Sequence, residues 1–212
     1  TPPDENGMMS FGLTPMDTAL CEAARDVILQ VNENVPFVRG VDNMINIKDV
    51  TCVIDKTQEL CVMSPSEPSE LDNKIADIIA ERIPDGACIQ LGIGGTPDAL
   101  GSIIAQSDLK DLGMHTELCT DGFLDLYKAG KLTNKRKNIF PGKGVLGLAT
   151  GSQARYDWLD ENPGVIALPI AYVNDPAVIG SMDNFISLNS CVSIDLYGQI
   201  NSESAGLRHI SR

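Results

Sequence analysis

Two short stretches of the sequence contain residue types that can serve in catalysis or ligand binding. The first, ACIQLGIGGTPDALGSII at residues 87–104, places Gly92, Gly94 and Gly95 between an apolar run and a helix-like pattern. A glycine turn between a strand and a helix exposes backbone N–H groups, which can hold a phosphate or an oxyanion. Glycines can also serve the geometry of a tight turn alone, and the sequence leaves both interpretations open.

The second stretch is MHTELCTDG, residues 114–122. On a strand, His115, Glu117 and Cys119 share one face, with about 13 Å between positions 115 and 119. That distance is too long for a Cys–His nucleophile pair, provided the segment is a strand. Glu117 remains, and a carboxylate at a strand end beside N–H donors can act as nucleophile or base. A cap on the following helix is the alternative that these residues leave open.

A dinucleotide site is a further interpretation of the glycine turn. It requires a G-x-G-x-x-G pattern, and Pro97 occupies the third glycine position. In its favour, Glu117 lies near the end of the next strand, where a ribose-binding carboxylate would be found. We therefore keep a nicotinamide-dependent, Rossmann-type oxidoreductase as an alternative. A sugar-phosphate isomerase with Glu117 as its base and a binding module without catalysis are two others.

The elements around these stretches predict the fold. Residues 69–83 have the pattern of an amphipathic helix, and ACIQLGI that of a buried strand. TPDALGSIIAQ predicts a helix with Thr96 as its N-cap and Pro97 at its first position. Strand-like and helix-like segments then alternate to about residue 198. We predict an α/β fold with an open, largely parallel sheet and flanking helices, whose ligands bind beyond the carboxyl ends of the strands.

Charge and composition narrow the classes of function. The 212 residues carry a net charge of −13, which argues against a nucleic-acid partner. No apolar run reaches the length of a membrane span, and the first residues do not resemble a secretory signal. KLTNKRKNIFPGK, residues 131–143, holds five of the sixteen basic residues. This basic run predicts either a solvated loop or local attraction for a phosphate-bearing ligand.

The six cysteines do not indicate a metal site. None forms a CxxC pair, and two histidines cannot complete a zinc cluster with them at the usual spacing. Several cysteines lie in apolar runs, which is typical of buried, reduced thiols. We therefore expect no metal and a cytoplasmic location.

Five stretches together closely resemble the acetyl-CoA hydrolase/transferase family, and most of all its 4-hydroxybutyrate and butyryl-CoA:acetate CoA-transferases. They are LGIGGTPDAL, HTELCTDGFLDL, GKLTNKRKNIFPGK, YVNDPAVIG and SLNSCVSIDLYGQINSESAGL. The resemblance implies α/β domains of the NagB/RpiA-like, CoA-transferase-like kind. Residues 1–40 resemble the end of the family's N-terminal domain, residues 41–69 a linker and strand region, and residues 70–212 a C-terminal domain that stops short of its end.

The resemblance also assigns roles to residues. Glu117, in the H-T-E segment, corresponds to the family's nucleophile, and Asn174 to an asparagine close to it. The family's oxyanion and CoA-binding turn corresponds to Gly92, Ile93, Gly94, Gly95 and Thr96. Asn189 and Ser193 correspond more weakly, since many relatives carry a glutamate where this chain has Ser193.

The function implied is the transfer of CoA between a short-chain acyl-CoA and a carboxylic acid through a glutamyl-CoA thioester on Glu117. The same site could serve an acyl-CoA hydrolase. Coenzyme A is then a substrate, no cofactor is bound permanently, and acyl-CoA and short-chain carboxylates are the partners, without nucleic acid or membrane. We expect a homo-oligomer. Because the chain ends just before a second glycine-rich loop of the family, we expect an internal segment that is inactive by itself.

Overall fold

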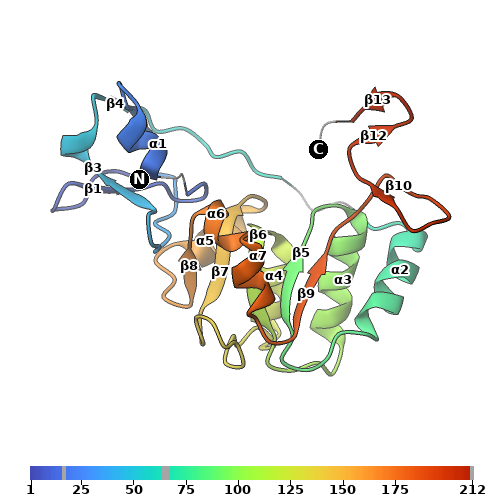
Figure 1. Ribbon diagram of the computed structural model, residues 1–212. Coiled ribbons are helices and arrows are strands. Elements are labelled where there is room, and N and C mark those ends of the chain that lie inside the picture. Colours follow the sequence, from blue (N-terminus) through green and yellow to red (C-terminus); the bar gives the residue numbers. More distant parts are fainter. Residues whose placement is uncertain (16–17, 64–66, 211–212) are drawn as a thin grey trace.

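A five-stranded parallel sheet organises the chain (Figure 1). The computed structural model describes residues 1–15, 18–63 and 67–210. Within these residues the strands follow the order β8-β7-β6-β5-β9. Their bounds are Cys88–Leu91 for β5, Gly113–Cys119 for β6, Gly144–Ala149 for β7, Val165–Ala167 for β8 and Phe185–Leu188 for β9. The predicted open, parallel α/β sheet is confirmed.

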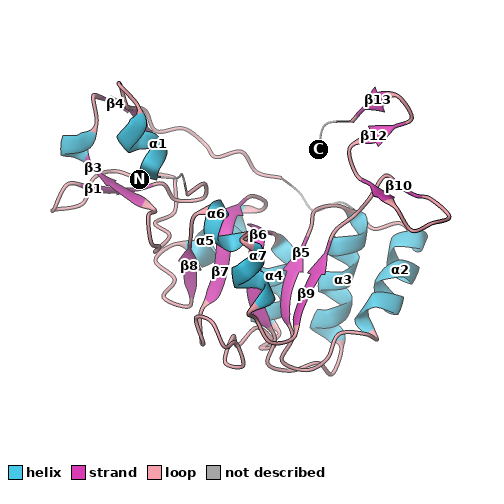
Figure 2. Cartoon of the chain, viewed as in Figure 1, coloured by secondary structure: helices cyan, strands magenta, loops and turns pink. Residues whose placement is uncertain are grey.

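Helices cover both faces of this sheet (Figures 1 and 2). Val145 of β7 packs with Leu168 and Val173 on the face of the short helix α6, whereas Leu146 joins the main core on the opposite face. Burial on both faces explains why β7 and β8 are continuous apolar runs. The helices are α2 Glu70–Ala80, α3 Gly95–Gln106, α4 Asp121–Lys128, α5 Gln153–Leu159, α6 Ile170–Val173 and α7 Pro176–Gly180.

The N-terminal residues form a separate small unit, in blue and cyan in Figure 1. Here β1 (Met8–Ser10) pairs antiparallel with β3 (Met44–Asn46), and β2 (Ile28–Val31) pairs parallel with β4 (Cys52–Asp55). The unit also holds α1 (Thr18–Ala23) and the 3-10 turn η1 (Ile47–Asp49), and Met9, Val31 and Ile45 form its core.

The N-terminal unit meets the main sheet at its edge. Gly40 bridges Ala167 of β8, and the Val41 amide donates to the Ala167 carbonyl at 3.2 Å. A Cβ at position 40 would lie 2.3 Å from that carbonyl oxygen, so the close approach requires glycine. The predicted domain boundaries at residues 40 and 69 stay predictions.

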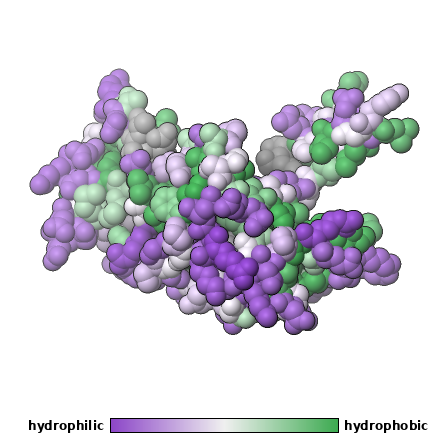
Figure 3. Space-filling model, turned by 60° about the horizontal axis from the view of Figure 1, so that its bottom comes forward, coloured by the Kyte–Doolittle hydropathy of each residue, from purple (hydrophilic) through white to green (hydrophobic). Residues whose placement is uncertain are grey.

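Two hairpins project from the body after β9 (Figure 1). They pair β10 (Ser193–Ile194) with β11 (Ile200–Asn201) and β12 (Ser204–Ala205) with β13 (Arg208–His209). Leu196 and Leu207 are fully exposed, and Figure 3 shows hydrophobic residues, in green, on this projecting segment. Only the first four residues of the strand-like run at 185–198 join the sheet.

None of the helices in the described part of the chain has the length and apolar character needed to cross a bilayer. The longest of them, α3, has 12 residues. A helix rises about 1.5 Å per residue, so α3 spans roughly 18 Å, well short of a hydrocarbon core about 30 Å thick.

Helices α3 and α4 touch through their glycines. A Cβ built on Gly101 would lie 2.8 Å from the Cα of Gly122. Both positions are buried. The two helices, which follow β5 and β6, are therefore held at a distance that only a hydrogen at position 101 allows.

We predict that Gly101→Ala destabilises the fold by about 1–3 kcal/mol, because a methyl group would force the two helices apart. Gly180→Ala is the matched control, since a Cβ there lies more than 4 Å from every atom of the described residues beyond its chain neighbours and the backbone of its own helix. Denaturant unfolding followed by the fluorescence of Trp158, which packs against the main core, measures both changes. Equal stability of the two variants would contradict the proposed contact.

Candidate active site

The candidate site lies where β5 and β6 separate. These strands share only two residue pairs, Cys88 with Gly113 and Ile89 with Met114, whereas β5 stays paired with β9 over all four of its residues. The carboxyl ends of β5 and β6 are therefore apart, and an open cleft of about 360 Å³ lies there. Its lining is Gln90, Leu91, Gly92, Ile93, Glu117, Leu118, Asn189, Ser190 and Ser202.

Glu117 presents its carboxylate at this cleft. It is the exposed residue of β6, whose first four residues and Cys119 are buried. The Asn174 side chain donates a hydrogen bond from Nδ2 to Glu117 Oε2 at 2.8 Å. One carboxylate oxygen is thus held by an amide, a contact that fixes the orientation of the group.

Asn174 is delivered by helix α6. It is the C-cap residue of α6, and its backbone N–H donates to the Ile170 carbonyl at 2.9 Å. Helix α6 lies directly over Gly147 of β7, where a Cβ would stand 2.3 Å from Ile170 Cδ1 and 2.9 Å from the Glu117 carbonyl oxygen. Glycine at 147 therefore lets α6 approach the strand that carries Glu117.

The glycine turn forms the other wall of the cleft. Ile93 is more than half exposed, and the Gly92 N–H is already bound, since it donates to the Leu188 carbonyl at 3.0 Å. Helix α3 begins at Gly95, with Gly94 as N-cap at φ +116° and ψ 179°. Residues that carry a Cβ rarely adopt these backbone angles. The N–H groups of the first helical turn lack intrahelical acceptors and can meet negative charge.

The predicted N-cap at Thr96 is wrong. The left-handed conformation of Gly94 starts the helix two residues earlier, so Thr96 and Pro97 lie inside the first turn. Proline is tolerated there because its missing N–H would have had no helical acceptor. The hydroxyl of Thr96 is then free for another partner.

That partner is Asp72, which sequence reasoning missed. Thr96 Oγ1 donates to Asp72 Oδ1 at 2.6 Å, and the same carboxylate accepts from the backbone and hydroxyl of Ser69. A Cβ on Gly95 would lie 2.6 Å from Asp72 Oδ2, so glycine at 95 makes room for this acid. Hydrogen bonds from Ser69 and Thr96 lower the pKa of Asp72. The S-x-x-D pattern at 69–72 signals a capping box on α2, but not this second contact.

The structure brings together five of the predicted site residues. Glu117, Gly92, Ile93 and Asn189 border the cleft, and Asn174 binds Glu117. Four others lie outside its lining. Gly94 shapes the turn, Gly95 and Thr96 contact Asp72, and Ser193 pairs with Asn201 in the projecting hairpin.

The two other reactive groups of β6 are not positioned as a pair. Cys119 is fully buried, its thiol contacts Met114 Sδ at 3.9 Å, and burial raises its pKa to about 12. The imidazole of His115 forms its hydrogen bond with the Val173 carbonyl rather than with Cys119. A thiol that keeps its proton is a poor nucleophile, so Glu117 is the exposed reactive group of this strand.

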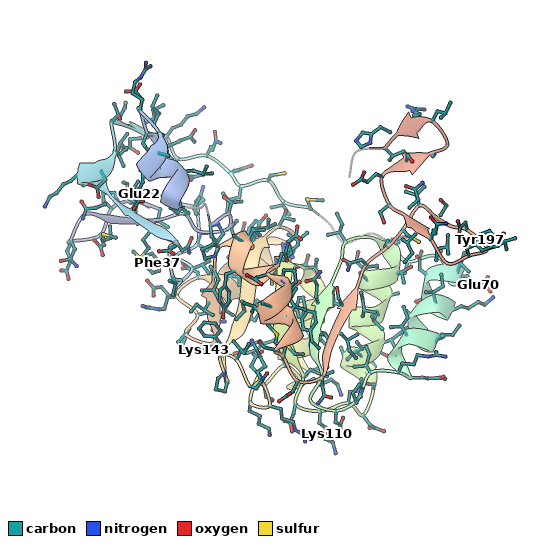
Figure 4. All side chains as sticks on the ribbon, viewed as in Figure 1. Glu22, Phe37, Glu70, Lys110, Lys143 and Tyr197 are labelled. Carbon is teal, nitrogen blue, oxygen red and sulfur yellow. The ribbon has the colours of Figure 1, made fainter. Side chains whose placement is uncertain are left out.

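The basic run at 131–143 faces away from the cleft. It lies before the amino end of β7, and Figure 4 labels Lys143 at that edge of the molecule. Lys135 and Arg136 pair with Asp111, and Lys131 and Lys143 donate to backbone carbonyls. Within the described chain these positive charges serve the fold and do not reach the candidate site.

Lys137 is the buried member of this run. Its Nζ donates to the carbonyls of Met114 at 2.8 Å and Lys143 at 2.6 Å. Burial lowers the pKa of Lys137 to about 8 and raises that of the nearby Cys88 thiol to about 11. The side chain therefore ties the loop to the amino ends of β6 and β7.

Comparisons with a family model and with a curated relative agree. Residues 151–212 match the family model described as the acetyl-CoA hydrolase/transferase C-terminal domain. The chain is also 45% identical to a probable butyrate:acetyl-CoA coenzyme A-transferase from Syntrophomonas wolfei subsp. wolfei, over 98% of this chain and 47% of the relative. The chain belongs to the acetyl-CoA hydrolase/transferase family.

A solved structure and a further curated relative are also similar to this chain. The crystal structure of a 4-hydroxybutyrate CoA-transferase from Porphyromonas gingivalis superimposes with a TM-score of 0.87 at 39% identity, over 93% of this chain and 50% of that chain. An acetyl-CoA hydrolase from Yarrowia lipolytica is 29% identical over 59% of this chain and 23% of its own length. The chain spans about half the length of the curated transferase that it matches.

We predict that Asp72→Ala loosens the glycine turn at residues 92–95. With the acceptor of Thr96 removed, amide exchange in peptides covering residues 92–100 should accelerate about fivefold. Ser69→Ala is the control, because it weakens the same cap of α2 and leaves the bond between Asp72 and Thr96 in place. Hydrogen exchange read by mass spectrometry separates them, and identical exchange in both variants would rule out the assigned role.

Proposed function

We propose that the full-length protein containing this chain transfers CoA between a short-chain acyl-CoA and a carboxylic acid, with Glu117 as the nucleophile. The observation that carries the proposal is the exposed Glu117 carboxylate. One of its oxygens is held by Asn174 at 2.8 Å, and it borders a cleft whose other wall is the turn at Gly92 and Ile93. The names of the relatives, which are CoA-transferases, agree with this chemistry.

The first half of the reaction loads CoA onto the protein. The free oxygen of Glu117 attacks the thioester carbonyl, and the carbon–sulfur bond breaks to release the CoA thiolate. Thiol pKa values near 8.5 make the thiolate an acceptable leaving group. The thiolate then attacks the glutamyl carbonyl of the resulting anhydride. This step releases the first carboxylate and leaves Glu117 as a CoA thioester.

The second half runs the same steps in reverse with a new acid. Its carboxylate attacks the glutamyl thioester, the CoA thiolate leaves, and the thiolate then attacks the acyl carbonyl of the new anhydride. Glu117 is regenerated as a carboxylate, and the acceptor acid departs as its CoA thioester. No net proton or electron is needed, because each thioester broken is matched by one formed.

A carboxylate is a weak nucleophile, so the site must stabilise the tetrahedral oxyanion. Backbone N–H groups from Ile93 to Gly95 at the start of α3 are the proposed donors, and one such donor typically contributes about 3 kcal/mol. Asn174 keeps Oε2 engaged and leaves the other oxygen for attack. Coenzyme A acts here as a substrate, and the chemistry calls for no permanently bound cofactor.

We predict that incubation of the full-length protein with acyl-CoA, followed by borohydride or hydroxylamine trapping, modifies Glu117. Glu117→Gln should lose the adduct and slow acyl exchange by about 10³-fold or more, because an amide cannot form the anhydride. Glu81→Gln, an exposed glutamate at the end of α2, is the control and should behave as wild type. Peptide mapping by mass spectrometry locates the adduct, and modification elsewhere would defeat the proposal.

Hydrolysis of acyl-CoA at the same residue is the second candidate function. Glu117 is exposed at an open cleft in this segment, and a relative carries the name acetyl-CoA hydrolase. Water that reaches the glutamyl thioester would release CoA without an acceptor acid. Exclusion of water therefore decides between the two reactions.

We expect transfer to dominate in the full-length protein. Thioester consumption should rise about tenfold or more when acetate or butyrate is added, because a carboxylate then competes with water for the glutamyl thioester. A thiol-release assay with and without the acid measures this ratio. Equal rates in both conditions would favour the hydrolase.

A further inference from the structure

His115 is a buried polar residue that the proposed chemistry does not use. Its side chain is fully buried, and its Nε2 lies 2.8 Å from the Val173 carbonyl oxygen. The ring of Phe185 meets the imidazole edge-on, with ring centroids 5.9 Å apart. The imidazole therefore lies between the sheet and helix α6.

The partner of Nε2 fixes the tautomer. A carbonyl oxygen only accepts hydrogen bonds, so Nε2 of His115 carries the proton and donates it. Burial lowers the pKa of His115, which keeps the ring neutral and leaves Nδ1 as an acceptor. Nδ1 is buried and has no hydrogen-bond partner among the residues that the structure describes. A buried acceptor without a hydrogen bond costs free energy, which an apolar side chain in this space would avoid. What the imidazole adds in return is its hydrogen bond to Val173.

The acceptor stands directly before Asn174. The carbonyl of Val173 and the N–H of Asn174 belong to the same peptide unit. The hydrogen bond from His115 therefore orients the backbone of Asn174. Asn174 in turn donates to Glu117. Because His115 and Glu117 are two residues apart on β6, their side chains lie on the same face. Strand β6 thus makes two hydrogen bonds to the C-terminal end of α6, one through His115 and one through Glu117.

We propose that His115 is a positioning residue, which acts through the Val173–Asn174 peptide to hold the Asn174 amide on Glu117. The inference rests on the proposed role of Glu117 as nucleophile. Its consequence is that Oε2 stays engaged and the other oxygen points to the substrate in a single orientation. Such preorganisation lowers the entropic cost of reaching the transition state.

A double-mutant cycle in the full-length protein tests this coupling. His115→Leu and Asn174→Ala should each slow formation of the Glu117 adduct by about tenfold or more. If His115 acts through Asn174, the double variant should match Asn174→Ala within about twofold. Effects that multiply in the double variant would overturn the inference, because a merely structural role does not depend on Asn174.

His115→Gln is the rescue variant. Glutamine carries a donor nitrogen at about the reach of imidazole Nε2, so this variant should keep the adduct rate within about threefold of wild type. His115→Asn places its amide too close to the strand and should behave as His115→Leu. If His115→Gln slowed adduct formation as much as His115→Leu, the result would contradict the role of the donated hydrogen bond.

A structural readout keeps the inference separate from the proposed function. In crystals of the full-length His115→Leu variant, the distance between Asn174 Nδ2 and Glu117 Oε2 should exceed hydrogen-bond range, while His115→Gln should keep it near the 2.8 Å seen here. An unchanged distance in His115→Leu would overturn the positioning role. Absence of any adduct in the wild type would defeat the proposed function instead, and this crystallographic comparison would still decide the role of His115.

Discussion

The site depends on one constraint, the early end of the pairing between β5 and β6. If their register continued past Ile89 and Met114, Gly92 would stand opposite Glu117 and the ladder would close the cleft. Instead, β5 remains bound to β9, and β6 remains bound to β7 as far as Cys119. The backbone groups that face the gap border an open cleft, where water can satisfy them.

The short helix α6 places Asn174 beside the carboxylate of Glu117 at this gap. Four residues cannot hold a helix in isolation, so its position comes from tertiary contacts. Gly147 allows the close approach, and Val173 is buried against Val145 of β7. The amide of Asn174 is then held by the packing of a sheet, which is more rigid than a loop.

Much of this could be predicted from the sequence, because local patterns encode local structure. Apolar runs such as ACIQL and the glycine turn predicted the strand, the turn and the helix in order. The position of the helix start was missed, because the conformation of Gly94 rather than the side chain of Thr96 sets it. The contact of Asp72 with Thr96 spans 24 residues and leaves no local signal, and α6 was hidden inside the apolar run at 164–173.

The internal pairing of the basic run has a consequence for the long-range electrostatics of the chain. Its lysines and arginine are paired with backbone carbonyls and with Asp111 at the amino ends of β6 and β7, in a chain with a net charge of −13. The described chain therefore offers a polyanionic ligand no long-range attraction. Encounter with it is governed by diffusion against a mild repulsion, which dissolved salt screens within roughly 10 Å at 0.1 M ionic strength.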